Sequence, residues 1–249
     1  MPTFGLCIID TDSYELAKNA FDISTSKFKF DKHYIFTDQP AMFSNPAQAI
    51  AVKKIEKVDD YNNLVLKFIP EVVDVDYLLV IQFDGFILNQ NQWSNLFLHY
   101  DYIGAPWPLS NYPELNVGNG GFSLRSRKLL QACRSLPYDG SVAEDVFIAR
   151  HSRPYLETEK GVRFASAGVA SHFSVEEVPV PYSTFGFHGL RHLPRLYRGN
   201  IAYLIENLPP RVFTNQILLR NLMKEGPAAQ ALLKKRLSQL ASAQSSVGS

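Results

Sequence analysis

The feature that most constrains the fold is the apolar run at residues 78–88, LLVIQFDGFIL, which holds one carboxylate, Asp84, followed directly by a glycine. Such a run is typical of a strand that lies in the centre of a sheet and is buried on both faces. An ionised carboxylate in apolar surroundings is strongly disfavoured unless it is paired or binds a metal. The sequence therefore demands either a partner or a functional role for Asp84.

Strand-like and helix-like segments alternate around this run. The first helical pattern begins with Asp12 and Glu15, which have the spacing of a capping box. The strand patterns lie at 4–10, 33–38, 49–55 and 77–84, and the helical patterns at 12–21 and 59–73. This alternation predicts an open α/β sheet with parallel strands and right-handed crossovers. Ligands of such sheets bind beyond the carboxyl ends of the strands, where Asp10, Asp38 and Asp84 fall.

The rest of the chain divides at residue 190. Up to that point, we expect a strand at 120–126 leading into a helix, a short helix at 143–156, a short element at 164–174 and a Gly-rich loop at 183–190. Beyond it, 211–223 and 228–240 have helical patterns, and the last residues are expected to be disordered. We therefore predict an α/β domain at 1–190 and a basic helical C-terminal extension at 191–249 packed on it.

Composition limits the function and the compartment. The 25 basic and 24 acidic side chains argue against general nucleic-acid binding. Residues 191–249 are unbalanced, with nine Lys or Arg against two Glu, which suits either an anionic partner or a solvated helical face. Two cysteines provide no disulfide framework. With no signal-like start and no run near the ~18 apolar residues that span a membrane, we expect a cytoplasmic protein, peripheral on the inner face of the membrane at most.

Four short clusters contain residue types that carry chemistry. They are QFDG at 82–85, VGNGGFSLRSR at 117–127, AEDVFI at 143–148 and FGFHG at 185–189. Each has a structural alternative: a strand-end Asp often caps a helix, three glycines often form a turn, acids favour a helix N-terminus, and a lone His is usually packed or exposed. The Gly-rich cluster matches neither a P-loop nor a dinucleotide fingerprint.

Taken in order, QFDGFIL, YDYIGAPWP, VGNGGFSLRSR, EDVFI and FGFHG resemble the DUF5672 family, which is grouped with the GT-A nucleotide-sugar glycosyltransferases. The resemblance runs from about Phe4 to about Gly189. It implies a GT-A-like, Rossmann-like fold with a mixed, mostly parallel central sheet flanked by helices. It also implies a nucleotide-sugar donor, a divalent Mn²⁺ or Mg²⁺ ion, and transfer of a sugar to a hydroxyl of a glycan or lipid-linked acceptor.

The resemblance assigns the donor half of a site to positions near the strand ends. Asp84 and His188 would bind the metal. Gln82 replaces the first acid of the usual Asp-x-Asp motif, which often contacts the ribose, and its amide can bind a hydroxyl there. The remaining residues expected to bind the donor are Ile9, Asp10, Thr11, Asp38, Phe83 and Arg125, the last through phosphate oxygens.

The acceptor half follows in the same way. Asn119, Gly120 and Gly121 would line the site between donor sugar and acceptor, and Trp107 would stack on a sugar face. The acidic pair matches the inverting pattern, in which Asp145 is the base that deprotonates the acceptor hydroxyl and Glu144 orients the sugar.

Two other functions compete with this interpretation. A sugar nucleotidyltransferase would need a Gly-rich phosphate loop after the first strand, which IIDTDSYEL does not provide. A carbohydrate-binding or scaffold module would keep the fold without the metal. In the basic extension, Arg191, Arg195 and Arg198 could reach pyrophosphate or an acidic acceptor. The helix at 229–240 would either lie on an anionic membrane or pack on the domain.

Overall fold

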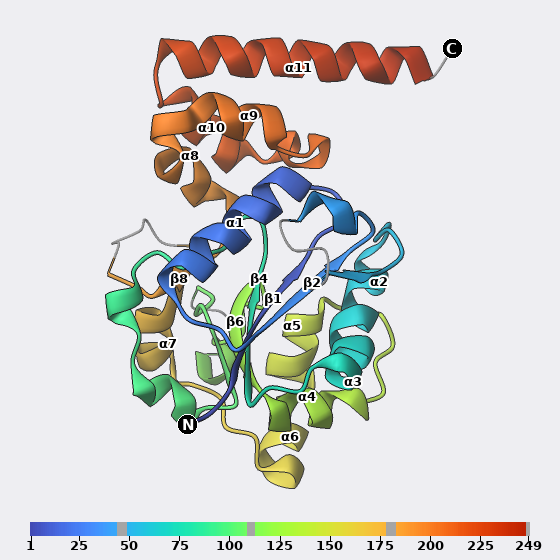
Figure 1. The fold of residues 1–249 in the computed structure, drawn as a ribbon, viewed down its shortest axis with the longest axis vertical. Helices are drawn as coiled ribbons and strands as arrows, with labels where there is room; N and C mark the ends of the chain where they lie inside the picture. The colour runs from blue at the N-terminus through green and yellow to red at the C-terminus, as the bar shows by residue number, and fades with distance from the viewer. Residues whose placement is uncertain (44–48, 109–112, 178–182, 248–249) are drawn as a thin grey trace.

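The protein, described by a computed structural model over residues 1–43, 49–108, 113–177 and 183–247, is built around a six-stranded sheet, whose central strands lie between layers of helices (Figure 1). The strand order is β3-β2-β1-β4-β6-β5. The first four are parallel, and β6 is antiparallel to both β4 and β5. The strands are β1 Phe4–Ile9, β2 Lys32–Thr37, β3 Ala49–Ala51, β4 Tyr77–Ile81, β5 Tyr102–Gly104 and β6 Phe122–Ser126, with a separate pair, β7 Ser174–Val175 and β8 Gly186–Phe187.

The mixed, mostly parallel sheet confirms the predicted fold class. The third strand is shorter than predicted, because only Ala49–Ala51 pairs with β2. The three-residue strand β5 was not predicted, since its sequence is too short to show a periodic pattern. The run that contains Asp84 begins with β4, which lies between β1 and β6 as expected of a central strand.

Alternate residues of the central strands enter different cores, which explains their continuous apolar runs. In β4, Leu79 and Ile81 belong to the largest hydrophobic cluster, whereas Leu78 and Val80 belong to a second one. Helices α1 and α7 contribute to the first cluster, and α3 and α4 to the second. The helices before residue 190 are α1 Tyr14–Lys27, α2 Val58–Asn63, α3 Ile69–Val72, α4 Arg127–Arg134, α5 Glu144–Val146, α6 Arg153–Lys160 and α7 Ala167–Phe173.

The chain after residue 190 forms a helical layer stacked above α1 (Figure 1). Its helices are α8 Leu193–Leu196, α9 Ile201–Asn207, α10 Gln216–Met223 and α11 Pro227–Val247. Leu204, Leu218 and Leu222 are buried in the same cluster as residues of α1 and β1, so this layer shares its core with the sheet. In the described residues, no helix is both long and apolar enough to span a bilayer.

The last helix differs in two respects from its predicted form. In the helix predicted at 229–240, Ala229 and Leu233 are buried, but Leu237 is 37% exposed, because α11 rests on α9 and α10 through a narrow face. The helix also continues to Val247, through most of the segment expected to be disordered, and the final two residues lie outside the described part.

Candidate active site

A cavity of about 530 Å³ lies at the carboxyl ends of β1 and β4. It is lined by Ile9, Asp10, Thr11, Gln82 and Phe83, five of the residues predicted to bind the donor. Parallel neighbours in a sheet end at the same edge, so residues that are more than 70 positions apart in the sequence meet here. The remaining wall comes from Asp12, from the segment after β3, from Tyr61 and from Arg211.

The turn after β1 is fixed by Asp10. Its Oδ1 accepts hydrogen bonds from the backbone N–H groups of Asp12 (2.9 Å) and Ser13 (2.5 Å), at the start of α1. Burial raises the pKa of Asp10 to about 6, against the opposing effect of these two bonds. Asp10 therefore takes the place of the predicted capping box, since the first residue before the helix, Ser13, makes no side-chain cap bond.

Two further predicted donor residues have structural contacts of their own. Thr11 Oγ1 accepts a hydrogen bond from the backbone N–H of Ile55 (3.0 Å), which ties the cavity wall to the β1 turn. Asp38 accepts a hydrogen bond from the Tyr14 hydroxyl (2.9 Å) and is not among the described residues that line the cavity.

The chain folds back so that His188 meets Asp84. The backbone N–H of Gly189 donates to the Asp84 carbonyl (2.8 Å), and the N–H of His188 donates to the Val175 carbonyl (2.9 Å). Nε2 of His188 then lies 3.4 Å from Oδ1 of Asp84, which is buried and accepts no hydrogen bond from the described residues. The sequence predicted that these two side chains would meet at the site, although they are 104 positions apart.

Charge dominates the surroundings of this histidine. Burial alone would lower its pKa, but the carboxylates of Asp84 and Glu176 raise the pKa of His188 to about 10. The pKa of Asp84 is lowered despite its burial, because the imidazolium lies beside it. Glu176 Oε1 is 3.1 Å from Nδ1, on the far side of the ring from Asp84.

The same atoms suit a divalent cation. No group of three or more His, Cys, Asp or Glu residues in the described part of the chain is arranged to hold a metal. However, Gln82 Oε1 lies 3.1 Å from His188 Nε2, and Asp84 Oδ1 lies 3.4 Å from it. Neighbouring ligands of an octahedral Mg²⁺ are about 3 Å apart. Metal-binding histidines commonly donate their second N–H to a carboxylate, which Glu176 provides. Asp84, His188 and the Gln82 amide oxygen therefore fit a divalent ion.

Gly120 and Gly121 separate this histidine from the acidic pair. A Cβ atom on Gly121 would lie 2.2 Å from His188 Nε2, and one on Gly120 would lie 2.4 Å from Glu144 Oε1. A larger residue at either position would therefore force His188 or Glu144 to move. Asn119, directly before them, lies 3.1 Å from His188 Nδ1 through its own Nδ2. This segment therefore brings the two predicted halves of the site together.

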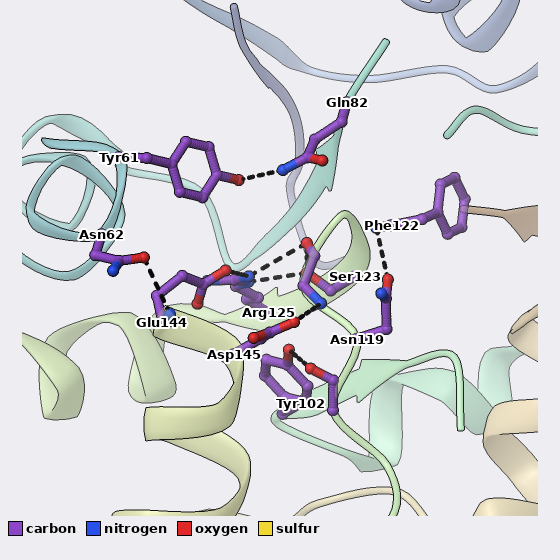
Figure 2. A network of polar contacts seen from close by, with 12 residues as sticks. Tyr61, Asn62, Gln82, Tyr102, Asn119, Phe122, Ser123, Arg125, Glu144 and Asp145 are labelled. Atoms are coloured by element: carbon purple, nitrogen blue, oxygen red, sulfur yellow. Dashed lines mark hydrogen bonds and ion pairs between the residues drawn. The ribbon is translucent and has the colours of Figure 1, made fainter. Parts of the chain in front are cut away.

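The two acids of the pair point in different directions, as Figure 2 shows. Glu144 is buried and faces Arg125, with Nη2 to Oε1 at 2.8 Å and Nη1 to Oε2 at 3.2 Å. Arg125 also donates to Ser123 Oγ (2.9 Å) and to the Gly120 carbonyl (3.3 Å). The family resemblance predicts that Arg125 binds phosphate and that Glu144 contacts a sugar. The structure instead pairs these two side chains, because β6 directs Arg125 inward, where only 1% of it is exposed.

Asp145 faces the Gly-Gly segment. Its Oδ2 accepts a hydrogen bond from the Gly120 N–H (3.1 Å), and its Oδ1 accepts one from the Val146 N–H (2.7 Å). Burial, followed by the negative charge of Glu144, raises the pKa of Asp145 to about 6. A carboxylate with this pKa is deprotonated at neutral pH yet basic enough to accept a proton.

Trp107 and the predicted arginines of the extension have other contacts. The Arg150 guanidinium lies 4.4 Å from the centre of the Trp107 ring, which is half-buried against a hydrophobic cluster. Arg191 pairs with Glu177, and Arg198 pairs with Glu225.

Three residues near the site were missed from the sequence. Glu176 and Tyr61 have no motif around them, and Arg211 falls within the helical pattern at 211–223, which does not mark it as a site residue. For Arg211, the excess of basic residues after residue 190 was the only available signal.

Several solved structures resemble this chain. A mannosyltransferase from Pyrobaculum calidifontis, solved with GDP-Man and Mn²⁺, matches with a TM-score of 0.50 and 11% identity, over 98% of this chain and 75% of that one. A glycosyltransferase involved in glycosylation of the major capsid of PBCV-1 matches at 0.49 and 11%, over 75% and 92%. Glucosyl-3-phosphoglycerate synthase from Mycobacterium tuberculosis, solved with Mn²⁺ and UDP, matches at 0.47 and 12%, over 83% and 80%. No curated protein sequence matches the chain.

At these identities the similarity concerns the fold, and the fold is that of the GT-A class, with its mostly parallel central sheet and flanking helices. The model of one family, described as "Protein of unknown function (DUF5672)", matches residues 46–188, which is more than half of the chain. The protein belongs to this family. The matched region contains Asp84, the Gly-Gly segment, the acidic pair and His188.

Proposed function

We propose that this protein is a metal-dependent, inverting glycosyltransferase that moves a sugar from a nucleotide-sugar donor to a hydroxyl of a glycan or lipid-linked acceptor. The observation that supports this most directly is the position of Gly120 and Gly121. The Gly120 N–H donates to Asp145, and Gly121 packs against His188. The groups that we propose as base and as metal ligand thus lie on either side of a segment without side chains.

The donor would occupy the cavity at the ends of β1 and β4. Ile9, Asp10 and Thr11 would contact the base and ribose, and the diphosphate would lie toward Asp84 and His188. Asp84, His188 and the amide oxygen of Gln82 would hold Mn²⁺ or Mg²⁺, which would neutralise the charge of the nucleoside diphosphate leaving group. Gln82 would then bind through an oxygen that the usual Asp-x-Asp motif supplies from a carboxylate.

Asp145 would act as the base. As the acceptor oxygen bonds to the anomeric carbon, its proton passes to the Asp145 carboxylate. The bond from that carbon to the phosphate oxygen breaks, and the nucleoside diphosphate leaves with the electron pair. A single displacement of this kind inverts the anomeric configuration. The two backbone N–H donors to Asp145 fix its orientation during the transfer.

Glu144 and Arg125 would act by positioning, in place of the direct ligand contacts expected from the sequence. Their ion pair is closed off from the cavity, and Arg125 also holds the Gly120 carbonyl. The pair therefore orients both Asp145, which follows Glu144 directly, and the glycine whose N–H binds it.

The function can be tested without knowing the acceptor, because donor hydrolysis needs only water. A panel of nucleotide sugars would be incubated with the protein and Mn²⁺, and release of nucleoside diphosphate would be measured with and without EDTA. Calorimetry with UDP and GDP, with and without Mn²⁺, would run in parallel. We expect one donor to be hydrolysed and its diphosphate to bind in a metal-dependent manner. Absence of metal-linked nucleotide binding would refute the proposal.

A further inference from the structure

Arg211 lies in the C-terminal layer, outside the region that matches the family model. It belongs to a 3₁₀ turn, Pro210–Thr214, whose neighbouring side chains Val212 and Phe213 are buried in the largest hydrophobic cluster. The backbone of the turn is therefore anchored. The Arg211 side chain itself is 61% exposed, so a fixed backbone presents a solvent-accessible guanidinium.

Arg211 lines the cavity at the ends of β1 and β4. Its Nε donates to Asp12 Oδ2 (2.8 Å), and its Cζ lies 5.7 Å from the centre of the Phe83 ring. Its charge also acts on the carboxylates of both Asp10 and Asp84. Arg211 therefore lies among acids from the ends of two strands, next to the motif that contains Asp84.

This position matters for an anionic ligand. Asp10, Asp12 and Asp84 would together repel the phosphates of a nucleotide at this edge of the sheet. An exposed ion pair such as Arg211–Asp12 contributes at most about 1 kcal/mol, so it exchanges readily for a better partner. Arginine binds phosphate through two parallel N–H···O bonds. The terminal nitrogens of Arg211 form no hydrogen bond with any residue that the structure describes, and so they remain available.

We propose that Arg211 binds a phosphate group of the nucleotide in this cavity, exchanging Asp12 for the ligand. The inference rests on the proposed function and adds to it, because it makes the C-terminal helical layer part of the donor site. The competing interpretation is that the Arg211–Asp12 pair only ties this layer to the β1 turn.

Calorimetry in EDTA and in Mn²⁺ would compare the wild-type protein with Arg211→Ala, Arg211→Lys and Arg220→Ala. Arg220 is an exposed arginine of the same layer, on α10, and is not among the described residues that line the cavity. Arg220→Ala therefore removes the same charge away from the proposed phosphate site. We expect Arg211→Ala to weaken binding of UDP or GDP by about 10- to 100-fold. We expect Arg211→Lys to weaken it less and Arg220→Ala to change it less than about twofold. Binding of the uncharged nucleoside should be unaffected in all variants.

Asp12→Asn separates the two interpretations. If Arg211 binds phosphate, this variant releases the guanidinium, and nucleoside diphosphate affinity should rise or stay equal while Arg211→Ala lowers it. If the ion pair only holds the C-terminal layer to the β1 turn, Asp12→Asn and Arg211→Ala should lower the unfolding temperature to a similar extent. Neither variant should then change the affinity for diphosphate relative to that for nucleoside.

Two results would overturn the inference in distinguishable ways. Wild-type protein that binds neither UDP nor GDP would remove the proposed function and this inference with it. Wild-type protein that binds a diphosphate no better than Arg211→Ala does would leave the proposed function intact and eliminate the role of Arg211. Circular dichroism spectra of each variant would show that the fold is retained.

Discussion

Two buried ion pairs lie on opposite sides of the Gly-Gly segment, and they differ in what they can become. Arg125–Glu144 is enclosed, and both carboxylate oxygens of Glu144 accept a hydrogen bond from the guanidinium. His188–Asp84 is less complete, since Asp84 Oδ1 accepts no hydrogen bond from the described residues. Arginine does not lose its proton in a protein, whereas histidine does. The first pair is therefore permanent, whereas under the proposed function a metal held by the same two residues would replace the second.

This difference separates structure from chemistry. A buried ion pair is weak evidence for stability or for function on its own, because desolvation offsets most of its attraction. What distinguishes the histidine pair is its surroundings: Gln82 Oε1 and Glu176 lie beside it, where under the proposed function they would supply one additional ligand atom and one supporting carboxylate. Arg125 has no comparable opening, because Ser123 and the Gly120 carbonyl take up its remaining contacts.

The largest effect is expected at Asp145, which the permanent pair orients. Asp145→Asn keeps the shape of the side chain but removes the base, so turnover should fall by about 10² to 10⁴. Binding of nucleoside diphosphate should not change. Steady-state kinetics and calorimetry would measure the two quantities. Asp139→Asn, an exposed acid in the loop before α5, is the matched control and should retain activity. Normal turnover in Asp145→Asn would eliminate it as the base.

Removing one partner of the permanent pair should strongly destabilise the protein. Arg125→Met leaves the Glu144 carboxylate buried without its partner, at a cost of about 3–5 kcal/mol in the free energy of unfolding. Urea unfolding would measure it. The double variant Arg125→Met/Glu144→Leu should recover most of this loss, because an apolar pair carries no unpaired charge.

The control for this experiment is Arg127→Met, two residues along the chain, where the side chain is exposed. Its unfolding midpoint should stay close to that of the wild type. If Arg125→Met were no less stable than Arg127→Met, the ion pair would not be the permanent element that the comparison requires.

The convertible pair should respond to metal instead. At a Mn²⁺ concentration of about 100 times the dissociation constant, the free energy of unfolding of the wild type should rise by about 2.7 kcal/mol. Calorimetric unfolding with Mn²⁺ and with EDTA would measure this gain. His188→Ala should lose most of it, because one of the two main ligands is gone. An equal gain in His188→Ala would place metal binding elsewhere.

The sequence was sufficient to predict the α/β sheet, because strand and helix periodicities alternate clearly and β4 is continuously apolar. It was also sufficient to single out Asp84, the Gly-Gly segment, the acidic pair and His188. Their residue types and order carry the family resemblance, and the fold brings them close together, while their roles stay a prediction.

The direction in which side chains point could not be predicted. Arg125 and its neighbours on β6 alternate between two faces. The strand β5, which was not predicted, contributes Tyr102 beneath the guanidinium. This places Arg125 in a closed core instead of at a ligand. Glu176 and Arg211 reach the site through long-range folding of loops and helices, which leaves no periodic signal in the sequence. Contact of the basic extension with a membrane stays a prediction.

The smallest expected effect concerns pH, and it tests the coupling between the permanent pair and the base. Burial and then Glu144 raise the pKa of Asp145 to about 6, while Arg125 opposes them. A base works only when deprotonated, so kcat/KM should fall about tenfold per pH unit below pH 6. Glu144→Gln removes a negative charge beside Asp145, which should lower its pKa and preserve activity to a lower pH. The fraction of neutral-pH activity left at about pH 5 should therefore be larger in Glu144→Gln than in the wild type.

The control is Asp139→Asn, which does not alter the surroundings of Asp145, and its pH profile should match that of the wild type. Because all three proteins share the same histidine and Asp84, a difference between their profiles reports on Asp145, and identical profiles would show that Glu144 does not tune the base.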